Sequence, residues 1–282
     1  MNIYLVGLVR DQAKSIQKNL EHLIGNLQHF GNVYVHIVES DSNDETLLEL
    51  QDFAEKYPRF TYESCGDTSN LFPDRISRIR HCRNRYANFL SNVELTVDFT
   101  CVADLDGINR KLRPAAIRDC LSAIIPWDAC FANQRFGYYD IYALRAINWC
   151  EEDIFEELAR CRTQASWKLR ESKIRTQVIY KKMRKIRESD EWIPVQSAFG
   201  GFGIYRGNPF KKYDYTHLQE SNQNECEHVA LHNKMVTSGL ELFINPKLIN
   251  SNINEHNIMR VKLIRKAIIK LVIFRQFLSG RE

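Results

Sequence analysis

The chain has 282 residues, 44% of them hydrophobic and 26% charged, with a formal net charge of +4. This length can bury one large core and no linker rich in Gly, Ser or Pro divides it, so we expect one domain over residues 1–257, with an insertion at 151–191 and a tail at 258–282. Without a leader-like start or a bilayer-spanning apolar run, an exported or membrane-spanning protein is not expected, and eight cysteines with no Cys-x-x-Cys pair favour the reducing cytoplasm.

The first half of the sequence alternates apolar, strand-like segments with segments of helical periodicity. The strands are expected near 2–8, 32–38, 59–63, 98–103 and 128–133, and the helices near 12–29, 45–57, 75–91 and 114–125. This alternation predicts an α/β fold in which a mainly parallel sheet is flanked by helices. In such sheets ligands bind beyond the carboxyl ends of the strands, so a site is expected in the loops there.

Polar loops follow three of these strands. Arg10 follows the first, an acidic turn at 39–46 follows the second, and Asp104-Leu105-Asp106-Gly107 follows the fourth. Two carboxylates one residue apart can hold Mg²⁺ or Mn²⁺ while phosphate oxygens fill the remaining positions, provided that the backbone turns between them, as Gly107 allows. The tetrapeptide therefore predicts phosphate-linked chemistry.

The same tetrapeptide has two other interpretations. Haloacid dehalogenase-type phosphatases carry Asp-x-Asp-Gly on their first strand and use the first carboxylate, here that of Asp104, as nucleophile. In this chain about a hundred residues precede Asp104, and no later Gly-Asp-x-x-x-Asp pair follows. The other interpretation is structural: an Asp-rich turn would cap the helix that begins near Pro114.

Four later segments carry further patterns. Five arginines lie between 75 and 85 on an expected helix, where a guanidinium fork can grip phosphate. The helix-prone, basic segment 151–191 is either an arm exposed to solvent or a landing surface for an anionic acceptor, and because it lacks interleaved aromatics no nucleic acid is expected. The glycines and aromatics of 199–206 predict a pocket wall, and a helix is expected near 225–238.

Taken in order, these features resemble the GT-A glycosyltransferases. They are the opening strand, helix and strand, the acidic turn, the Arg/Asn helix at 78–85, the strand ending in Asp-x-Asp, and the late Glu/His helix. The chain looks most like the fungal capsule α-1,3-mannosyltransferase family and its bacterial relatives, over roughly residues 1–250. The resemblance implies a metal-dependent enzyme that moves a sugar from a GDP- or UDP-linked donor to a cell-surface glycan or lipid-linked acceptor, with Mn²⁺ or Mg²⁺ as cofactor.

The resemblance also implies roles for single residues. The metal ligands would be Asp104, Asp106 and His228. The donor-binding residues would be Arg10, Glu39, Asp41, Arg83, Asn84 and Asp104. The general base, if the reaction inverts configuration, would be Glu225 or Glu227. Two alternatives remain. His228 and His232 could form an i, i+4 zinc pair, although the sequence lacks the third ligand that a zinc hydrolase has. Ser42 and Glu45 could form a capping box for the helix that follows.

The tail contains seven Lys or Arg and one acid over 259–282. Residues 258–278 are expected to form a basic amphipathic helix, with Lys262, Arg265, Lys266 and Lys270 on one side and apolar residues on the other. We expect it to lie on an anionic membrane face, where each basic residue contributes about 1 kcal/mol, so that the protein is peripheral on the inner face of the membrane. One alternative is a terminal helix docked on the core, and another is a non-catalytic basic protein that binds membranes or polyanions.

Overall fold

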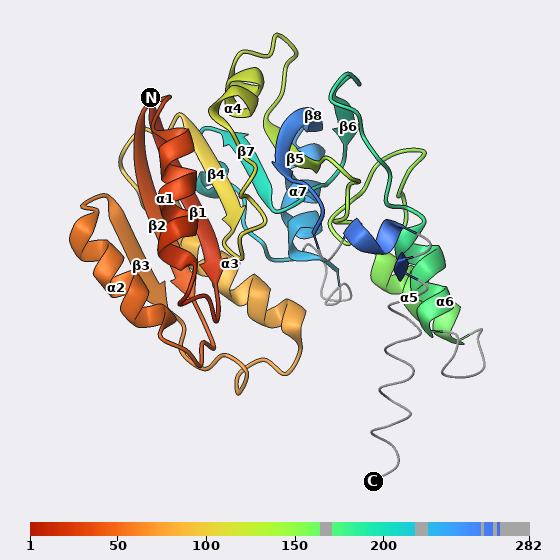
Figure 1. Cartoon of the computed structure of the whole chain (residues 1–282), viewed down its shortest axis with the longest axis horizontal. Helices are drawn as coiled ribbons and strands as arrows, with labels where there is room; N and C mark the ends of the chain where they lie inside the picture. Colours follow the sequence, from red (N-terminus) through yellow and green to blue (C-terminus); the bar gives the residue numbers. More distant parts are fainter. Residues whose placement is uncertain (164–170, 218–224, 255–256, 262–263, 266–282) are drawn as a thin grey trace.

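The computed structural model describes residues 1–163, 171–217, 225–254, 257–261 and 264–265. The eight strands of these residues form one mixed sheet in the order β3-β2-β1-β4-β7-β5-β8-β6 (Figure 1). The strands are β1 (Asn2–Val9), β2 (Asn32–Glu39), β3 (Phe60–Ser64), β4 (Phe99–Asp104), β5 (Ala129–Gln134), β6 (Ile193–Val195), β7 (Phe202–Arg206) and β8 (Leu242–Ser251). The α-helices are α1 (Ile16–Leu27), α2 (Thr46–Lys56), α3 (Arg75–Ser91), α4 (Pro114–Leu121), α5 (Ile154–Thr163), α6 (Glu171–Arg175) and α7 (Glu227–Thr237).

Most strands run in the same direction. β3, β2, β1 and β4 are parallel neighbours, as are β5 and β8, while β7 runs antiparallel between β4 and β5, and β6 runs antiparallel to β8. The expected α/β fold, with a mainly parallel sheet flanked by helices, is confirmed. The carboxyl ends of β1, β2 and β4 therefore meet at one edge, as ligand binding in such sheets requires.

The sheet is buried on both faces. Along β1 the side chains alternate, so that Ile3 and Leu5 join the core under α1, α2 and α4, whereas Tyr4 and Val6 join the core under α3 and α7. Successive side chains of a strand point to opposite faces, and a strand covered on both faces is apolar throughout. This double burial explains why the first strand is a continuous apolar run in the sequence.

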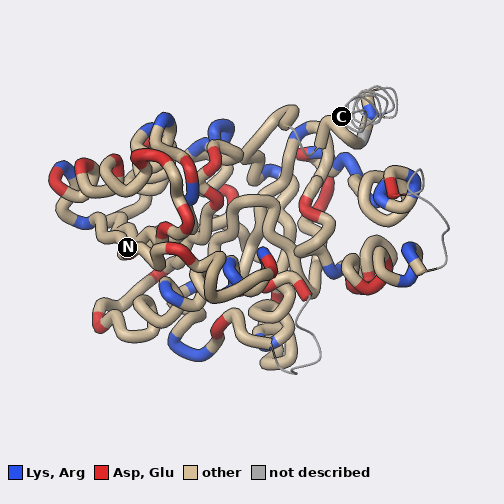
Figure 2. The backbone as a smooth tube through the Cα atoms, turned by 90° about the horizontal axis from the view of Figure 1, so that it is seen from below, with Lys and Arg blue, Asp and Glu red and all other residues tan. Residues whose placement is uncertain are grey.

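The basic segment 151–191 is an arm that packs on the core. It contains α5, α6 and a π-helical turn, η2 (Thr176–Tyr180), and it buries Leu158 and Val178 in the core on the α3 face. Several of its described cations pair with acids of the same segment: Arg160 with Glu152, Arg162 with Glu171, and Lys182 with Glu157. Basic and acidic positions lie side by side in this part of the tube (Figure 2). The arm is therefore not exposed to solvent throughout, because its apolar residues complete the core on the α3 face.

The segment 199–206 forms a turn and a strand. Gly200 and Gly201 have φ values of +67° and +84°, a backbone conformation that residues other than glycine rarely adopt. They lead into β7. Gly203 in β7 faces Phe131, whose ring would lie 3.0 Å from an added Cβ atom. The bulky group that Gly203 accommodates is thus the protein's own Phe131, and of this segment Phe199 is the residue that lines the main pocket. The strands β6, β7 and β8 were not expected from the sequence.

The capping box predicted for α2 is not formed. The helix starts after Glu45, which makes no side-chain cap hydrogen bond. The Ser42 hydroxyl instead accepts from the backbone N–H of Asp11, and the Asp44 carboxylate accepts from the N–H of Thr46 at 3.0 Å. The loop after β2 is therefore tied to the loop after β1, which holds the two neighbouring strand ends together.

Most of the tail, including 266–278 of the expected amphipathic helix, lies outside the described residues. Its described part begins with a 3₁₀ turn, Asn257–Arg260. The guanidinium of Arg265 lies over the ring of Tyr180 in the arm, at 5.8 Å from the ring centroid. Among the described residues, no helix is both long and apolar enough to cross a bilayer.

Candidate active site

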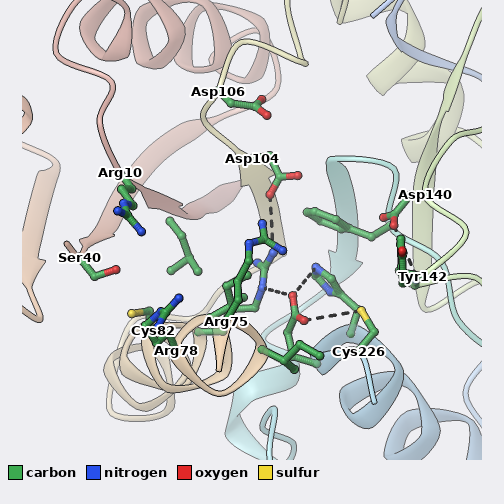
Figure 3. A pocket seen from close by; sticks show the side chains of 18 of the residues that line it. Arg10, Ser40, Arg75, Arg78, Cys82, Asp104, Asp106, Asp140, Tyr142 and Cys226 are labelled. Carbon is green, nitrogen blue, oxygen red and sulfur yellow. Dashed lines mark hydrogen bonds and ion pairs between the residues drawn. The ribbon is translucent and has the colours of Figure 1, made fainter. Parts of the chain in front are cut away.

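A pocket lies beyond the carboxyl ends of β1, β2 and β4. Its volume is about 780 Å³, which is in the range of small-molecule sites. Figure 3 shows Arg10 and Ser40 on one side, Arg75 and Arg78 from α3 below, and Asp104 and Asp106 above. Asp140, Tyr142 and Cys226 complete the pocket on the opposite side (Figure 3). The Asp-x-Asp sequence and the arginine helix thus meet in one pocket, although they are distant in sequence.

The two aspartates are held by the backbone around them. Asp104 is the last residue of β4, and its N–H donates to the Gly201 carbonyl at 2.9 Å. The backbone turns at Gly107, whose φ is +90°, and the Asp106 carboxylate accepts from the N–H of Ile108 at 2.9 Å. Leu105 between them is buried in the core under α1. Both carboxylates line the pocket because the chain turns there, as Gly107 led us to expect.

The carboxyl group of Asp104 is in an unfavourable place for a negative charge. Burial raises its pKa to about 7, and although Arg83 opposes this, the charges of Asp106, Asp140 and Glu227 raise the pKa further. A divalent cation would relieve this repulsion, and carboxylate oxygens are the ligands that Mg²⁺ and Mn²⁺ prefer. Asp104 and Asp106 therefore fit a metal whose remaining ligands are water and phosphate oxygens.

The predicted three-ligand metal site is not assembled by protein side chains alone. Among the described residues, no group of three or more His, Cys, Asp or Glu side chains is arranged to hold a metal ion. His228 lines the same pocket as Asp104 and Asp106, but its ring stacks on Phe199 at 3.9 Å between ring centroids. The carboxylate nearest to it is that of Glu227, with 3.9 Å between Nε2 and Oε1.

Arg83 is a buried cation at the centre of the site. Its side chain is 6% exposed, its Nε donates to the Glu227 carboxylate at 2.9 Å, and its Nη1 donates to the Tyr86 hydroxyl at 3.0 Å. Its Nη2 lies 3.6 Å from the Asp104 carboxylate. Arg83 thus connects β4 with α7. Neighbouring Asn84 does not line the pocket, and its side-chain oxygen accepts from the N–H of Tyr215 at 2.9 Å.

The loop after β2 supplies one pocket residue and one structural residue. Asp41 lines the pocket and accepts from the Thr68 hydroxyl at 2.5 Å and the Ser69 N–H at 3.0 Å. Partial burial would raise the pKa of Asp41, but these hydrogen bonds outweigh it and lower the pKa. Glu39 is 1% exposed, lies outside the pocket lining, and accepts from the Ser42 N–H and the Ser64 hydroxyl. Glu39 therefore holds the loop in shape through these hydrogen bonds and does not face the pocket.

Three arginines line the pocket, and in the part of the chain that the structure describes none of them pairs with an acid from the opposite wall. The Arg10 side chain is 53% exposed, and its described ion pair is with adjacent Asp11, at 3.2 Å. Arg78 donates to the carbonyl groups of Phe72 and Pro73, and Arg75 stands at the first turn of α3. Guanidinium groups that are not bound to carboxylates remain available to an anionic ligand.

The two candidates for the general base, Glu225 and Glu227, lie at the start of α7 and have different surroundings. Glu225 is not in the pocket lining, and its carboxylate lies 3.3 Å from Nδ1 of His217, while burial raises its pKa. Glu227 lines the pocket but is engaged by Arg83 and by the Cys226 thiol, which donates at 3.6 Å. Of the two candidate bases, only Glu227 therefore lies where a substrate would bind.

The two histidines of α7 have different surroundings. Both ring nitrogens of His232 are hydrogen-bonded, to the Ser197 hydroxyl at 2.9 Å and the Tyr205 hydroxyl at 2.8 Å, so it cannot form the alternative zinc pair. Burial and the nearby charge of Arg83 lower the pKa of both histidines, that of His232 to about 3. Within the described residues, the buried ring nitrogens of His228 have no hydrogen-bond partner.

This difference predicts opposite effects of two substitutions. His232→Ala should lower the free energy of unfolding by about 3 kcal/mol, because it removes two buried hydrogen bonds and leaves a cavity. His228→Ala should cost less stability but should reduce metal-dependent turnover more. Urea denaturation and donor-hydrolysis rates in Mn²⁺ would measure both effects. If the two variants lose the same stability and the same turnover, His228 does not take part in metal-dependent turnover and His232 is not the more important of the two for stability.

Several pocket residues were not expected from the sequence. Asp140 follows β5, and its carboxylate accepts from the Gly200 N–H at 3.0 Å. Tyr142 follows it on the same wall, and the arm contributes Phe155 and Arg175. For Asp140 and Tyr142 the sequence signal is the aromatic, acidic run after the fifth predicted strand, where a ligand-binding loop is expected. Phe155 and Arg175 belong to the basic segment 151–191, which the sequence offered as a possible landing surface for an acceptor.

The phosphatase alternative does not agree with this geometry. In that family the nucleophile lies on the first strand, whereas Asp104 ends the fourth strand of the chain, and its carboxylate lies close to Arg83. The alternative in which the Asp-rich turn caps the helix near Pro114 is also wrong. Arg113 is the N-cap residue of α4, and no side chain caps this helix.

No protein-family model matches this sequence, and no curated protein matches it either. Among solved structures, the chain is similar to the mannosyltransferase PcManGT from Pyrobaculum calidifontis in complex with GDP-Man and Mn²⁺, with 12% identity and a TM-score of 0.47. This match covers 88% of this chain and 56% of that one. For S. aureus TarS in complex with UDP-GlcNAc the identity is 12%, the TM-score 0.47 and the coverage 91% and 60%. For mannosyl-3-phosphoglycerate synthase from Rubrobacter xylanophilus the values are 11%, 0.41, and 100% and 76%. The chain thus spans less than two thirds of the length of the first two.

Proposed function

We propose that the protein is a metal-dependent GT-A glycosyltransferase that moves a sugar from a nucleotide-diphosphate donor to a glycan or lipid-linked acceptor. One observation carries the proposal: Asp104 and Asp106 share a pocket with Arg10, Arg75 and Arg78 at the carboxyl ends of the parallel strands. A metal-binding pair of carboxylates facing three arginines, of which only Arg10 has a carboxylate partner within the described residues, suits a diphosphate group.

In this proposal each wall of the pocket has a task. The Asp41 carboxylate accepts hydrogen bonds from the ribose or the base, and the hydroxyl of neighbouring Ser40 can donate one. Asp104 and Asp106 hold Mn²⁺ or Mg²⁺. The bound cation would neutralise the charge that builds on the leaving diphosphate when the bond to the sugar breaks. Arg10, Arg75 and Arg78 stabilise the same charge from the other side, because cations fixed before the reaction need no reorganisation.

The acceptor would approach from the wall formed by β5 and the arm. Tyr142 and Phe155 offer apolar ring faces, and Asp140 offers a carboxylate beside them. If the reaction inverts configuration, Asp140 and Glu227 are the two carboxylates that can take the proton of an acceptor hydroxyl. Of these, Glu227 already neutralises Arg83, so we assign the proton transfer to Asp140.

The proposal is tested with a panel of GDP- and UDP-linked sugars. Slow hydrolysis of at least one donor is expected in Mn²⁺ or Mg²⁺ and not in EDTA, with release of the nucleoside diphosphate as the measured product. A protein that hydrolyses none of them, and that binds GDP and UDP no better with metal than without, is not this enzyme.

The tail belongs to the same proposal as a membrane anchor. Its seven basic residues over 259–282 favour attachment to the anionic inner face of a membrane. Removal of 266–282, which leaves the Arg265 contact with the arm in place, should release the protein from anionic vesicles and leave donor hydrolysis unchanged. Sedimentation with vesicles at low and high salt measures the binding, because salt screens attraction to headgroups. A truncated protein that still sediments with the vesicles would refute the anchor.

A further inference from the structure

A groove leads away from the candidate active site along α4 and β8. Its first hollow, of about 330 Å³, shares Asp106 with the main pocket. Its second hollow, of about 440 Å³, shares Lys111 and Asn252 with the first. Because the hollows share lining residues, they lie next to one another in a row that runs from Asp106 to Arg135 and Lys247.

The groove is basic. Apart from Asp106, its lining contains two acids and five cations, namely Arg110, Lys111, Arg113, Arg135 and Lys247. The two acids are already neutralised: Asp119 pairs with Lys247 at 3.0 Å, and Glu188 pairs with Arg135 at 2.9 Å. Arg110, Lys111 and Arg113 are exposed and form no ion pair within the described part of the chain. Three cations therefore remain for an external anion, with Arg110 and Lys111 in the hollow next to the active site and Arg113 in the following one.

These cations lie on a loop that is fixed relative to the aspartates. The Lys111 N–H donates to the Asn250 carbonyl of β8 at 2.9 Å. The buried Asn109 side chain donates to the Asp104 carbonyl at 2.8 Å and accepts from the Asn250 side chain at 2.9 Å. The Arg110 guanidinium lies against Gly107, since a Cβ atom there would be 2.8 Å from Arg110 Nε. The same hydrogen bonds that hold Asp104 in place thus also set the position of the basic loop.

We infer that this groove binds the acidic groups, phosphate or carboxylate, of an anionic glycan acceptor whose terminal sugar reaches the pocket. The inference rests on the proposed glycosyltransferase function and adds the class of acceptor. The donor diphosphate does not need these cations, because Arg10, Arg75 and Arg78 line the main pocket and not the groove. Single-stranded nucleic acid is disfavoured because no aromatic side chain lines either hollow, and sequence-tolerant binding of bases relies on such stacking.

The test compares two double variants that remove the same charge. Lys111→Ala/Arg113→Ala removes two free cations of the groove. Lys56→Ala/Arg59→Ala removes two exposed cations next to β3. β3 is one edge strand of the sheet and β6 is the other, so this control site lies away from β8 and the groove. Binding is measured by fluorescence anisotropy with labelled oligogalacturonate, a phosphodiester-linked sugar oligomer, a neutral dextran oligomer and a single-stranded oligonucleotide. Calorimetry with UDP or GDP and Mn²⁺ is run on the same proteins.

The groove variant should bind at least one of the two anionic glycans about tenfold more weakly than the wild type, and with a weaker salt dependence. The control variant should bind it as the wild type does, and the anionic glycan that loses affinity identifies carboxylate or phosphate as the recognised group. Equal binding by both variants, equal binding of dextran, or tighter binding of the oligonucleotide would overturn the inference. Nucleotide binding should be unchanged in both variants. If neither the wild type nor the variants bind nucleotide in the presence of metal, the proposed function fails. The glycan measurements still test whether the groove binds anionic glycans.

Discussion

Asp106→Ala should abolish the effect of Mn²⁺ or Mg²⁺ on the binding of UDP and GDP. Asp106 is exposed, and the backbone N–H of Ile108 binds only Oδ1, so its carboxylate can reach a metal, whereas the Asp104 carboxylate is also near Arg83. Loss of a direct ligand should weaken binding by more than the roughly 10- to 100-fold typical of an outer-shell partner. Calorimetry with each nucleotide, in metal and in EDTA, measures the difference.

Glu45→Ala is the matched control for this substitution. Glu45 is an exposed acid in the loop after β2, near the same edge of the sheet, and it does not line the pocket. Its removal changes the net charge by the same amount, so it should leave metal-dependent binding intact. If wild-type protein binds nucleotide equally well in EDTA, or if the two variants behave alike, Asp106 is not a metal ligand.

Arg83→Met should lower the free energy of unfolding by about 3–5 kcal/mol, the usual cost of breaking a buried ion pair from one side. Glu227 would keep a carboxylate that is 7% exposed and has lost its partner, and the Tyr86 hydroxyl would lose a donor. Urea denaturation of the protein without ligands measures the change. Since Arg83 also approaches Asp104, donor binding should weaken as well.

Arg85→Met is a close comparison, two residues further along α3. Arg85 pairs with Glu63 at 2.7 Å, but its side chain is 51% exposed, so its loss should cost less than about 1 kcal/mol. The double variant Arg83→Met/Glu227→Leu should be more stable than Arg83→Met, because it leaves no unpaired buried charge. If Arg83→Met and Arg85→Met lose similar stability, Arg83 does not have the central role described here.

The sequence was most informative where the signal is local. The five early strands and the helices between them were predicted because burial on both faces makes each strand an apolar run, and because a helix shows its own period within a few turns. Asp104 and Asp106 were found because both lie in one tetrapeptide with a glycine that permits the turn. The strands β7 and β8 escaped prediction because β7 runs against its neighbours and β8 lies far along the chain, so their pairing partners are not local.

The sequence by itself determined the α/β fold, the edge of the sheet where the site lies, and the Asp-x-Asp pair at its centre. Only the tertiary structure decided which polar residues face the pocket. It brought Glu227 to Arg83 across 144 positions and added Asp140 and Arg175, while Glu39, Asn84 and Glu225 lie outside the pocket lining. The physical reason is that side-chain direction depends on how helices and loops pack against the sheet. Such packing joins residues that are far apart in sequence, and no local pattern records it.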